Sequence, residues 1–419
     1  MSLKPTFFLV TLFLCFSCLA LEAAEERFPR PEFTRGYQLP ASTQPYQVMQ
    51  RNPFIALFSL LAVLGLTGYA LYSQRSRNAL RVLGLFSLVY FGFIYKGCIC
   101  AVGSIQNVAR ALVDLSAPVT LPVIVVFFVP LLTALYWGRL FCGAACPFGV
   151  LQDLVILHPV RVNPIIDRCL KLLPFIYLGL ALVFTLCGMG FIICEYDPFV
   201  GFFRFSGNLS MFIFGAFFLL CGIFIARPYC RYLCPYSVLL MLASSLSDRR
   251  VETSPDHCVN CQLCEDACPV GAIVKPRPEA YAETKEQAIK RLQWLIALVP
   301  VFLAVGLYTG SSLGASLSYL QPDIKLYRGV VSKDLNDDAV TAFYANDGNV
   351  KKLRLRARAL TTRLQFAFAV FGIYLALLFI GAAIVATSRR SNKFYIVEPV
   401  NCLACGRCYS WCPGKKVTS

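Results

Sequence analysis

Two runs of four cysteines constrain this chain more than any other feature of its sequence. Each run has the spacing C-x2-C-x2-C-x3-C and is followed directly by proline. The first cysteine run consists of Cys258, Cys261, Cys264 and Cys268, and the second cysteine run consists of Cys402, Cys405, Cys408 and Cys412. This spacing is typical of bacterial iron–sulfur proteins, in which three thiolates of a run hold one [4Fe–4S] cube and the fourth reaches the neighbouring cube.

A tight loop can aim three thiolates at one cube but not four, so we expect two [4Fe–4S] clusters that each take one ligand from the other run. The expected ligands are Cys258, Cys261, Cys264 and Cys412 for cluster one, and Cys402, Cys405, Cys408 and Cys268 for cluster two. A zinc ribbon or a disulfide framework is the alternative, but two full runs that each end in Cys-Pro favour clusters. The runs resemble a two-cluster bacterial ferredoxin.

The separation of the two runs is unusual for such a module. Residues 269–401, 133 in all, lie between them and include apolar stretches at 292–309 and 364–386. If the runs share clusters, both lie on one side of a membrane, and the insertion must cross and return as a helical hairpin. We therefore expect a ferredoxin-like module in two halves, 249–291 and 387–419. The polar segment between the spans, 310–363, is expected on the far side as a small domain or docking loop.

The composition places the rest of the chain in a membrane. Of its residues, 57% are hydrophobic and only 15% are charged, and the mean hydropathy is +0.63. These values indicate a mainly α, polytopic helical membrane protein. The formal net charge of +16 does not indicate nucleic-acid binding, because the basic residues mostly flank apolar stretches, where the positive-inside rule places them. We expect the bacterial inner membrane, with the ferredoxin-like module on the cytoplasmic side.

We predict about seven spans, after a signal peptide or anchor at 1–24 and an extracytoplasmic lead-in at 25–52. The expected spans are 53–72, 82–97, 119–137, 174–193, 209–226, 292–309 and 364–386, with an amphipathic piece at 104–116. A basic stretch from Lys351 to Arg363 adjoins the last span on its outer side, against the positive-inside rule. The shared clusters are the stronger constraint, so we expect this stretch outside.

The membrane domain, 53–248, contains a tandem repeat at 82–158 and 174–248. Each unit has an outward helix ending in cysteine, a return helix, and then aromatic-Cys-x3-Cys-Pro-aromatic. Parallel repeats imply a pseudo-two-fold axis along the membrane normal, which would bring the two cysteine pairs together. The resulting quartet is Cys142, Cys146, Cys230 and Cys234. It is expected to hold a third iron–sulfur centre or to form two redox dithiols; buried structural cysteines are the plainer alternative.

A second group of cysteines is expected near the outer surface. Its members are Cys98, Cys100, Cys187 and Cys194, and we expect the last two to share one helical face. Four thiolates could hold a [2Fe–2S] cluster or a copper ion, although a buried free cysteine is also a common small hydrophobe. The chain has only two histidines, which nearly excludes haem held by histidine pairs.

The stretch from Gly138 to Gly149, together with the two cysteine runs, resembles the membrane polyferredoxins of the NosR/NapH/CcoG type. The resemblance covers roughly 80–270 and 395–413. It implies an integral-membrane electron-transfer protein without its own small-molecule substrate site. Such a protein passes electrons between cytoplasmic or quinone-pool donors and a periplasmic or respiratory redox enzyme, with protein partners on both faces. A copper-reducing assembly factor and a membrane redox sensor are the alternative functions.

Overall fold

The structure is a computed structural model, and it is mainly helical. It describes residues 53–97, 101–113, 119–204, 209–249, 251–252, 258–276, 285–333, 337–346, 348–387, 392 and 394–412. The predicted segments 1–24 and 25–52, and the candidate ligands Cys98 and Cys100, lie outside these residues. Within them the only sheet has two strands, β1 (Ile273–Val274) and β2 (Ile396–Val397).

In the described part of the chain, five helical segments are long and apolar enough to cross a membrane. They are α2 (Pro53–Tyr72), α3 with η1 (Arg77–Ser87 and Leu88–Ile94), α7 with α8 (Pro164–Leu170 and Leu173–Leu186), α15 (Lys285–Leu317) and α18 (Val350–Thr387). Three shorter apolar helices accompany them: α5 (Leu121–Trp137), α11 (Leu209–Phe224) and α13 (Pro235–Ser245). Every predicted span thus coincides with an apolar helix. The spans expected at 119–137 and 209–226 correspond to α5 and α11, which belong to the shorter apolar helices.

The two repeat units turn at corresponding places. In the first unit α5 ends at Gly138, whose φ is +67°, and the chain continues into η2 (Phe141–Ala145) and α6 (Pro147–Val155). In the second unit α11 is followed by Arg227, whose φ is +50°, then by α12 (Pro228–Tyr232) and α13. The prolines after the cysteine pairs occupy the first positions of α6 and α13, as the sequence predicted, because proline suits a helix start.

The helices of both units enclose one apolar core. The amphipathic helix α4 (Ala101–Val113) packs against α5 and α8, and α13 packs against the same two helices. Large side chains at the centre include Leu178, Tyr236 and Leu240, all with 2% exposure or less. Phe199 and Phe203 of α10 (Pro198–Arg204) form a second aromatic cluster with Phe148 and Tyr229. These contacts fix the two cysteine pairs relative to each other.

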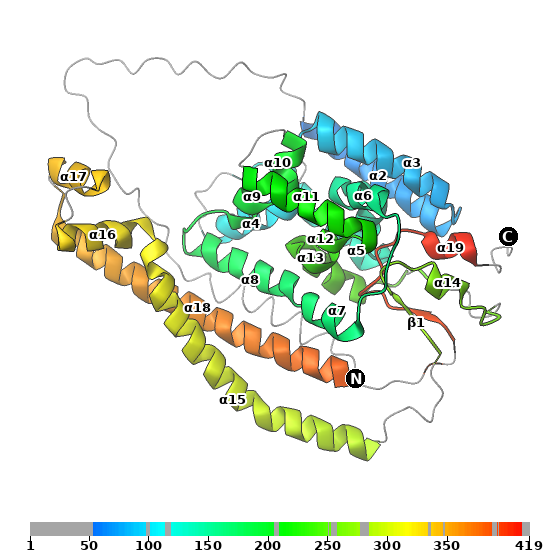
Figure 1. Ribbon diagram of the computed structural model, residues 1–419. Helices are drawn as coiled ribbons and strands as arrows, with labels where there is room; N and C mark the ends of the chain where they lie inside the picture. Colours follow the sequence, from blue (N-terminus) through cyan, green and yellow to red (C-terminus); the bar gives the residue numbers. More distant parts are fainter. Residues whose placement is uncertain are drawn as a thin grey trace.

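Helices α15 and α18 form the expected hairpin; they pack closely in the part nearer α16 and diverge toward the other end (Figure 1). Their contact is built from glycines: a Cβ atom at Gly372 would collide with the backbone of Gly306, and one at Gly310 would collide with the Phe368 carbonyl group. Small residues permit such close backbone approach between membrane helices. Within lipid the hydrophobic effect does not drive helix association, so van der Waals contact between the helices stabilises the pair instead. The hairpin returns the chain to the end of the molecule from which it left.

The hairpin helices are longer than the predicted spans. Helix α15 continues to Leu317 and α18 begins at Val350, so both ends of the segment expected at 310–363 belong to the hairpin helices. The stretch from Lys351 to Arg363 consists largely of Lys, Arg, Leu and Ala, all good helix formers, and it extends α18. Two short helices, α16 (Pro322–Ser332) and α17 (Asp338–Ala345), close the turn.

The span expected at 174–193 is also interrupted. Helix α8 ends at Leu186, and Gly188 and Gly190 then have φ values of +69° and +116° before α9 (Ile192–Tyr196) begins. The left-handed glycines break the helix because α-helical residues require negative φ. Cys187 and Cys194 therefore do not share one helical face, and that expectation was wrong.

Candidate iron–sulfur site

The two cysteine runs come together at one end of the molecule. Strand β1 pairs antiparallel with β2, with Ile273 opposite Val397, and the Glu398 N–H donates to the Ala272 carbonyl at 2.8 Å. The short helices α14 (Leu263–Asp266) and α19 (Arg407–Trp411) contact each other beside this sheet (Figure 1). We call this assembly the ferredoxin module. The hairpin thus separates its halves in sequence but not in space.

Both runs have the same backbone conformation. In the first run Asn260 and Gln262 have φ values of +53° and +66°, and in the second run Ala404 and Gly406 have +52° and +67°. Positive φ is uncommon for residues other than glycine. Such residues cluster at functional sites, where the surrounding structure maintains the less favourable backbone conformation. Alternation of right- and left-handed residues turns successive N–H groups to one side, an arrangement found at anion and iron–sulfur sites.

Thiols expected on cluster one lie together and come from both runs. The Cys412 side chain lies within electrostatic reach of Cys264, as does Cys258. Burial raises the pKa of the Cys264 thiol, and the neighbouring Cys412 and Cys258 add to this effect. Cys261, the remaining expected ligand, is exposed at the edge of the module. The structure therefore brings the last cysteine of the second run to the first.

The thiols expected on cluster two are also neighbours. Cys268 of the first run lies within electrostatic reach of Cys402, Cys405 and Cys408 of the second. Burial, followed by the other thiols, raises the pKa of Cys402 to about 12 and shifts the pKa of Cys408 in the same direction. A thiol in such surroundings becomes a thiolate only when a positive partner compensates the charge, as an iron–sulfur core does.

The spacing of these thiols does not match a single ion. No group of three or more His, Cys, Asp or Glu side chains among the residues described above is close enough to hold one metal ion. A [4Fe–4S] cube holds each thiolate on a different iron, so its ligands lie farther apart than those of one ion.

The quartet from the two repeat units also converges. Cys234 lies within electrostatic reach of Cys142, Cys146 and Cys230, and Tyr236 adjoins three of the four thiols. Cys142 lies in η2 and Cys230 in α12, whereas Cys146 and Cys234 precede the first residues of α6 and α13. The Gln152 amide donates to Cys230 Sγ at 3.2 Å. The tandem repeat was expected to bring these four cysteines together.

Two buried arginines flank the quartet, and the sequence analysis did not assign them a role. Arg139 and Arg227 each precede the first cysteine of their motif by three residues, and their exposures are 5% and 1%. Arg139 donates to Cys142 Sγ at 3.9 Å and to the Val400 carbonyl at 3.2 Å. The signal was present in the sequence as Arg-x2-Cys-x3-Cys-Pro, which occurs once in each repeat unit.

Arg227 has the stronger set of partners. Its guanidinium forms two hydrogen bonds to the Asp153 carboxylate, at 3.1 and 2.7 Å, and another to the Cys142 carbonyl. Arg227 also lies within electrostatic reach of Cys230 in the quartet and of Cys405 in the ferredoxin module. Burial alone would raise the pKa of Asp153, but Arg227 and then Arg407 hold it below its usual range.

The quartet loop and the ferredoxin module are in direct contact. A Cβ atom at Gly143, between Cys142 and Cys146, would lie 2.7 Å from the Ala404 carbonyl oxygen, between Cys402 and Cys405. Only glycine fits such an approach without displacing the backbone. The membrane domain and the second cysteine run therefore meet at backbone positions that lie between their cysteines. We call this contact the junction.

The outer cysteines are only partly described. Cys194 in α9 is exposed, and its sulfur lies 3.4 Å from the Cβ position of Gly103 in α4, the helix that follows Cys98 and Cys100 in the chain. Cys187 is buried after the end of α8. Between the outer and inner cysteines, Tyr177 lies within electrostatic reach of both Cys194 and Cys234.

Comparison with known families agrees with these features. Residues 119–163 match the model of a 4Fe-4S binding domain, and residues 220–272 match that of a 4Fe-4S dicluster domain. The first match contains Cys142 and Cys146, and the second contains the other cysteine pair and the first cysteine run. No solved structure matches the chain significantly.

Several curated proteins are similar to parts of this chain. Protein NirI of Paracoccus denitrificans is 34% identical over 33% of this chain and 22% of its own length. Regulatory protein NosR of Stutzerimonas stutzeri is 28% identical over 52% of this chain and 33% of its own. Putative electron transport protein YccM of Escherichia coli is 28% identical over 31% of this chain and 41% of its own. The chain spans less than half the length of each of these relatives.

The matches and the fold together define a class: membrane proteins with 4Fe–4S domains and an electron-transfer or regulatory role. Within this class the chain is similar to NosR and NirI over parts of its length.

Proposed function

We propose that this protein conducts electrons across a membrane, from the ferredoxin module through the quartet to an acceptor on the opposite side. The observation that carries this proposal is the junction, where Gly143 lies against the carbonyl of Ala404. A soluble ferredoxin would not require its second cysteine run to pack against the loop that carries the buried quartet cysteines. Iron–sulfur clusters supply reversible one-electron transfer when bound, and the protein supplies ligands, burial and spacing.

We assign the ligands of two [4Fe–4S] clusters to the two mixed sets of thiols in the ferredoxin module. The positions of Cys412 beside Cys264 and of Cys268 beside Cys405 support this cross-ligation. The matched left-handed residues of the two runs support it as well, because they give each run the same concave loop. The antiparallel strands β1 and β2 hold the halves in register.

The quartet is proposed to hold a third iron–sulfur centre. The family match at 119–163 includes two of its four cysteines, Cys142 and Cys146. The buried guanidinium groups of Arg139 and Arg227 provide positive charge where an anionic thiolate centre would otherwise be costly to bury.

On the opposite side, the proposed exit is the outer cysteine group around Cys194. Tyr177 lies between Cys194 and Cys234 and shortens the apolar gap between the outer and inner sulfurs. Buried Asp197 accepts hydrogen bonds from the Tyr229 hydroxyl at 2.7 Å and the Phe199 N–H at 2.9 Å, which fixes the loop after α9. We propose that the module faces the cytoplasm of the bacterial inner membrane and that redox proteins dock on both faces.

Sided proteoliposomes test this function. Vesicles that contain the protein and enclose ferricyanide are treated from outside with dithionite, which does not cross the bilayer. We expect the enclosed ferricyanide to be reduced by vesicles with outward-facing modules, at a rate proportional to protein content. The variant with Cys98→Ala, Cys100→Ala and Cys194→Ala should reduce it at least tenfold more slowly, because these residues are the proposed exit.

The control is Cys169→Ala, which removes an exposed cysteine of α7 that belongs to none of the proposed sets. It should leave the rate unchanged. If the triple variant reduces enclosed ferricyanide as fast as the unaltered protein, electrons do not leave through the outer cysteines. If the unaltered protein is no faster than empty vesicles, transmembrane conduction is refuted.

A further inference from the structure

A broad cleft opens beside the ferredoxin module. It has a volume of about 970 Å³, and its walls come from the α2–α3 turn and the first turns of α3, from Pro159, and from helices α14 and α19. The lining residues that matter here are Arg75, Arg77, Arg81, Asp266, Arg407 and Trp411. Because α14 carries Cys264 and α19 carries Cys408, one wall of the cleft consists of ligand-bearing helices.

The cleft carries an excess of positive charge. Four arginines line it, but its only acidic lining residue, Asp266, is already paired with Arg161 at 2.6 Å. Arg77 lies within electrostatic reach of both Arg407 and Arg81. The buried Nε atoms of Arg77 and Arg407 have no hydrogen-bond partner within the described residues. Like charges gathered in this way attract an anionic partner and repel a cationic one.

The cleft adjoins an exposed apolar surface next to the clusters. Trp411 is 61% exposed, Leu263 is 42% exposed, and Val259, beside Cys258, is 71% exposed. Arg77 also lies within electrostatic reach of Cys405. Large exposed apolar side chains rimmed by charge are typical of protein-binding surfaces. An electron-transfer partner must approach a cluster closely, and Leu263 and Trp411 lie on the two helices that carry Cys264 and Cys408.

We propose that this cleft is the docking site of an acidic redox protein that exchanges electrons with the ferredoxin module. The inference rests on the proposed function and names the class of partner on the module side. The apolar residues provide the contact centre, and the arginines orient the partner and raise its association rate. Such complexes bury little surface and dissociate quickly, so charge complementarity sets much of their rate.

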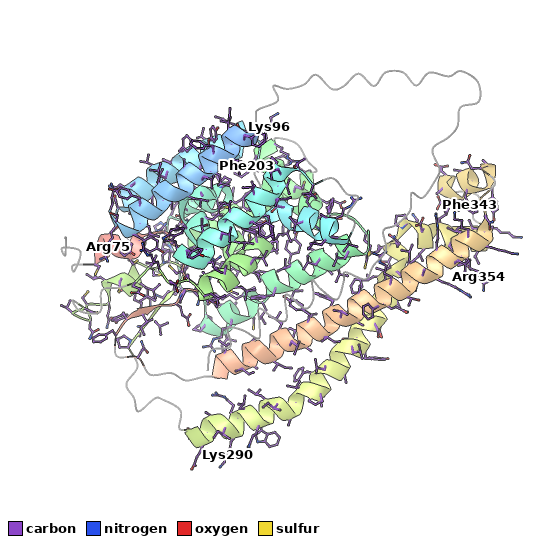
Figure 2. All side chains as sticks on the ribbon, turned by 180° about the vertical axis from the view of Figure 1, so that it is seen from behind. Arg75, Lys96, Phe203, Lys290, Phe343 and Arg354 are labelled. Atoms are coloured by element: carbon purple, nitrogen blue, oxygen red, sulfur yellow. The ribbon has the colours of Figure 1, made fainter. Side chains whose placement is uncertain are left out.

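The arginines could instead bind the phosphates of anionic lipids. Two features favour a protein. The cleft is far wider than one phosphate group, and its rim is formed by the ferredoxin module rather than by membrane-spanning helices alone. The basic residues of the opposite end, such as Arg354, have no such module beside them; Figure 2 shows Arg75 and Arg354 at opposite ends of the molecule.

The test measures binding in nanodiscs of neutral phosphatidylcholine. The probe is an acidic plant-type [2Fe–2S] ferredoxin with gallium in place of iron, which cannot exchange electrons. We expect saturable binding that weakens as salt is added, because surface charges are screened. Arg81→Glu should weaken it at least tenfold at low salt, and Arg77→Glu combined with Arg81→Glu should weaken it further, whereas Arg81→Lys should bind nearly as well as the unaltered protein.

The matched control reverses two exposed charges of α18, with Arg354→Glu and Arg358→Glu, and should leave binding unchanged. Equal binding by the Arg81→Glu variant and the unaltered protein would overturn the proposal, as would no binding by the unaltered protein. An effect seen only in nanodiscs that contain phosphatidylglycerol would assign the cleft to lipid. Iron content and dithionite reduction of each variant show separately whether the clusters are intact, and this assay does not depend on transmembrane conduction.

Discussion

The variant Arg227→Leu is expected to lose the quartet's centre and much of the stability of the junction. Its guanidinium forms two hydrogen bonds with Asp153 and one with the Cys142 carbonyl, and it is almost completely buried. Removing one partner of a buried ion pair typically destabilises a protein by about 3–5 kcal/mol, because the other charge remains without compensation. Arg407, 3.6 Å from Asp153, would recover part of this loss.

Thermal denaturation in detergent and the iron content of the purified protein provide the measurement. Arg227→Leu should denature at a clearly lower temperature and contain less iron than the unaltered protein. Arg227→Lys keeps the charge but loses the planar double hydrogen bond, so it should fall between the two. Arg139→Leu should have a smaller effect on stability, because the described residues give Arg139 no carboxylate partner. Identical denaturation temperatures and iron contents for Arg227→Leu and the unaltered protein would contradict the role of the junction.

The double variant Cys146→Ala with Cys234→Ala is expected to lose one complete centre. It removes one thiolate from each repeat unit, and two remaining ligands do not hold a cube. If three cubes are present, the iron content should fall from about twelve to about eight atoms per chain, and conduction into vesicles should stop. The clusters of the ferredoxin module should still be reduced by dithionite, because their own ligands are unchanged.

Colorimetric iron analysis together with the vesicle assay measures both effects, with Cys169→Ala as the control. Loss of conduction without loss of iron would mean that the quartet acts as redox dithiols. Retention of both would mean that these cysteines are structural, and the proposed route through the membrane would then be wrong.

The main architecture followed from the sequence because its motifs carry strong geometric requirements. The expected cross-ligation requires the two runs on one side of a membrane, and the hairpin of α15 and α18 has the even number of helices that this requires. The repeated Cys-x3-Cys-Pro motif forced a meeting of Cys142 and Cys230 by symmetry alone. In both cases the prediction depended on a cysteine motif that is compatible with only a few three-dimensional arrangements of the chain.

Other features depended on the three-dimensional packing. From the sequence alone, Arg139 and Arg227 resemble the basic residues that commonly flank membrane spans. Their burial in the structure distinguishes them. The break after α8 depends on the left-handed glycines, Gly188 and Gly190, which an apolar pattern does not reveal. Likewise, the length of α18 reflects helix propensity in a basic stretch, which hydropathy places outside a membrane span.

The most direct test of the account is the assignment of Cys412 and Cys268 to opposite clusters. Cys258→Ala and Cys402→Ala first define, by Mössbauer and electron paramagnetic resonance spectra, how loss of a ligand changes cluster one and cluster two. The account predicts that the spectra of Cys412→Ala match those of Cys258→Ala, and that the spectra of Cys268→Ala match those of Cys402→Ala. Spectra of Cys412→Ala that match those of Cys402→Ala would show that each run binds its own cluster and would contradict the shared module.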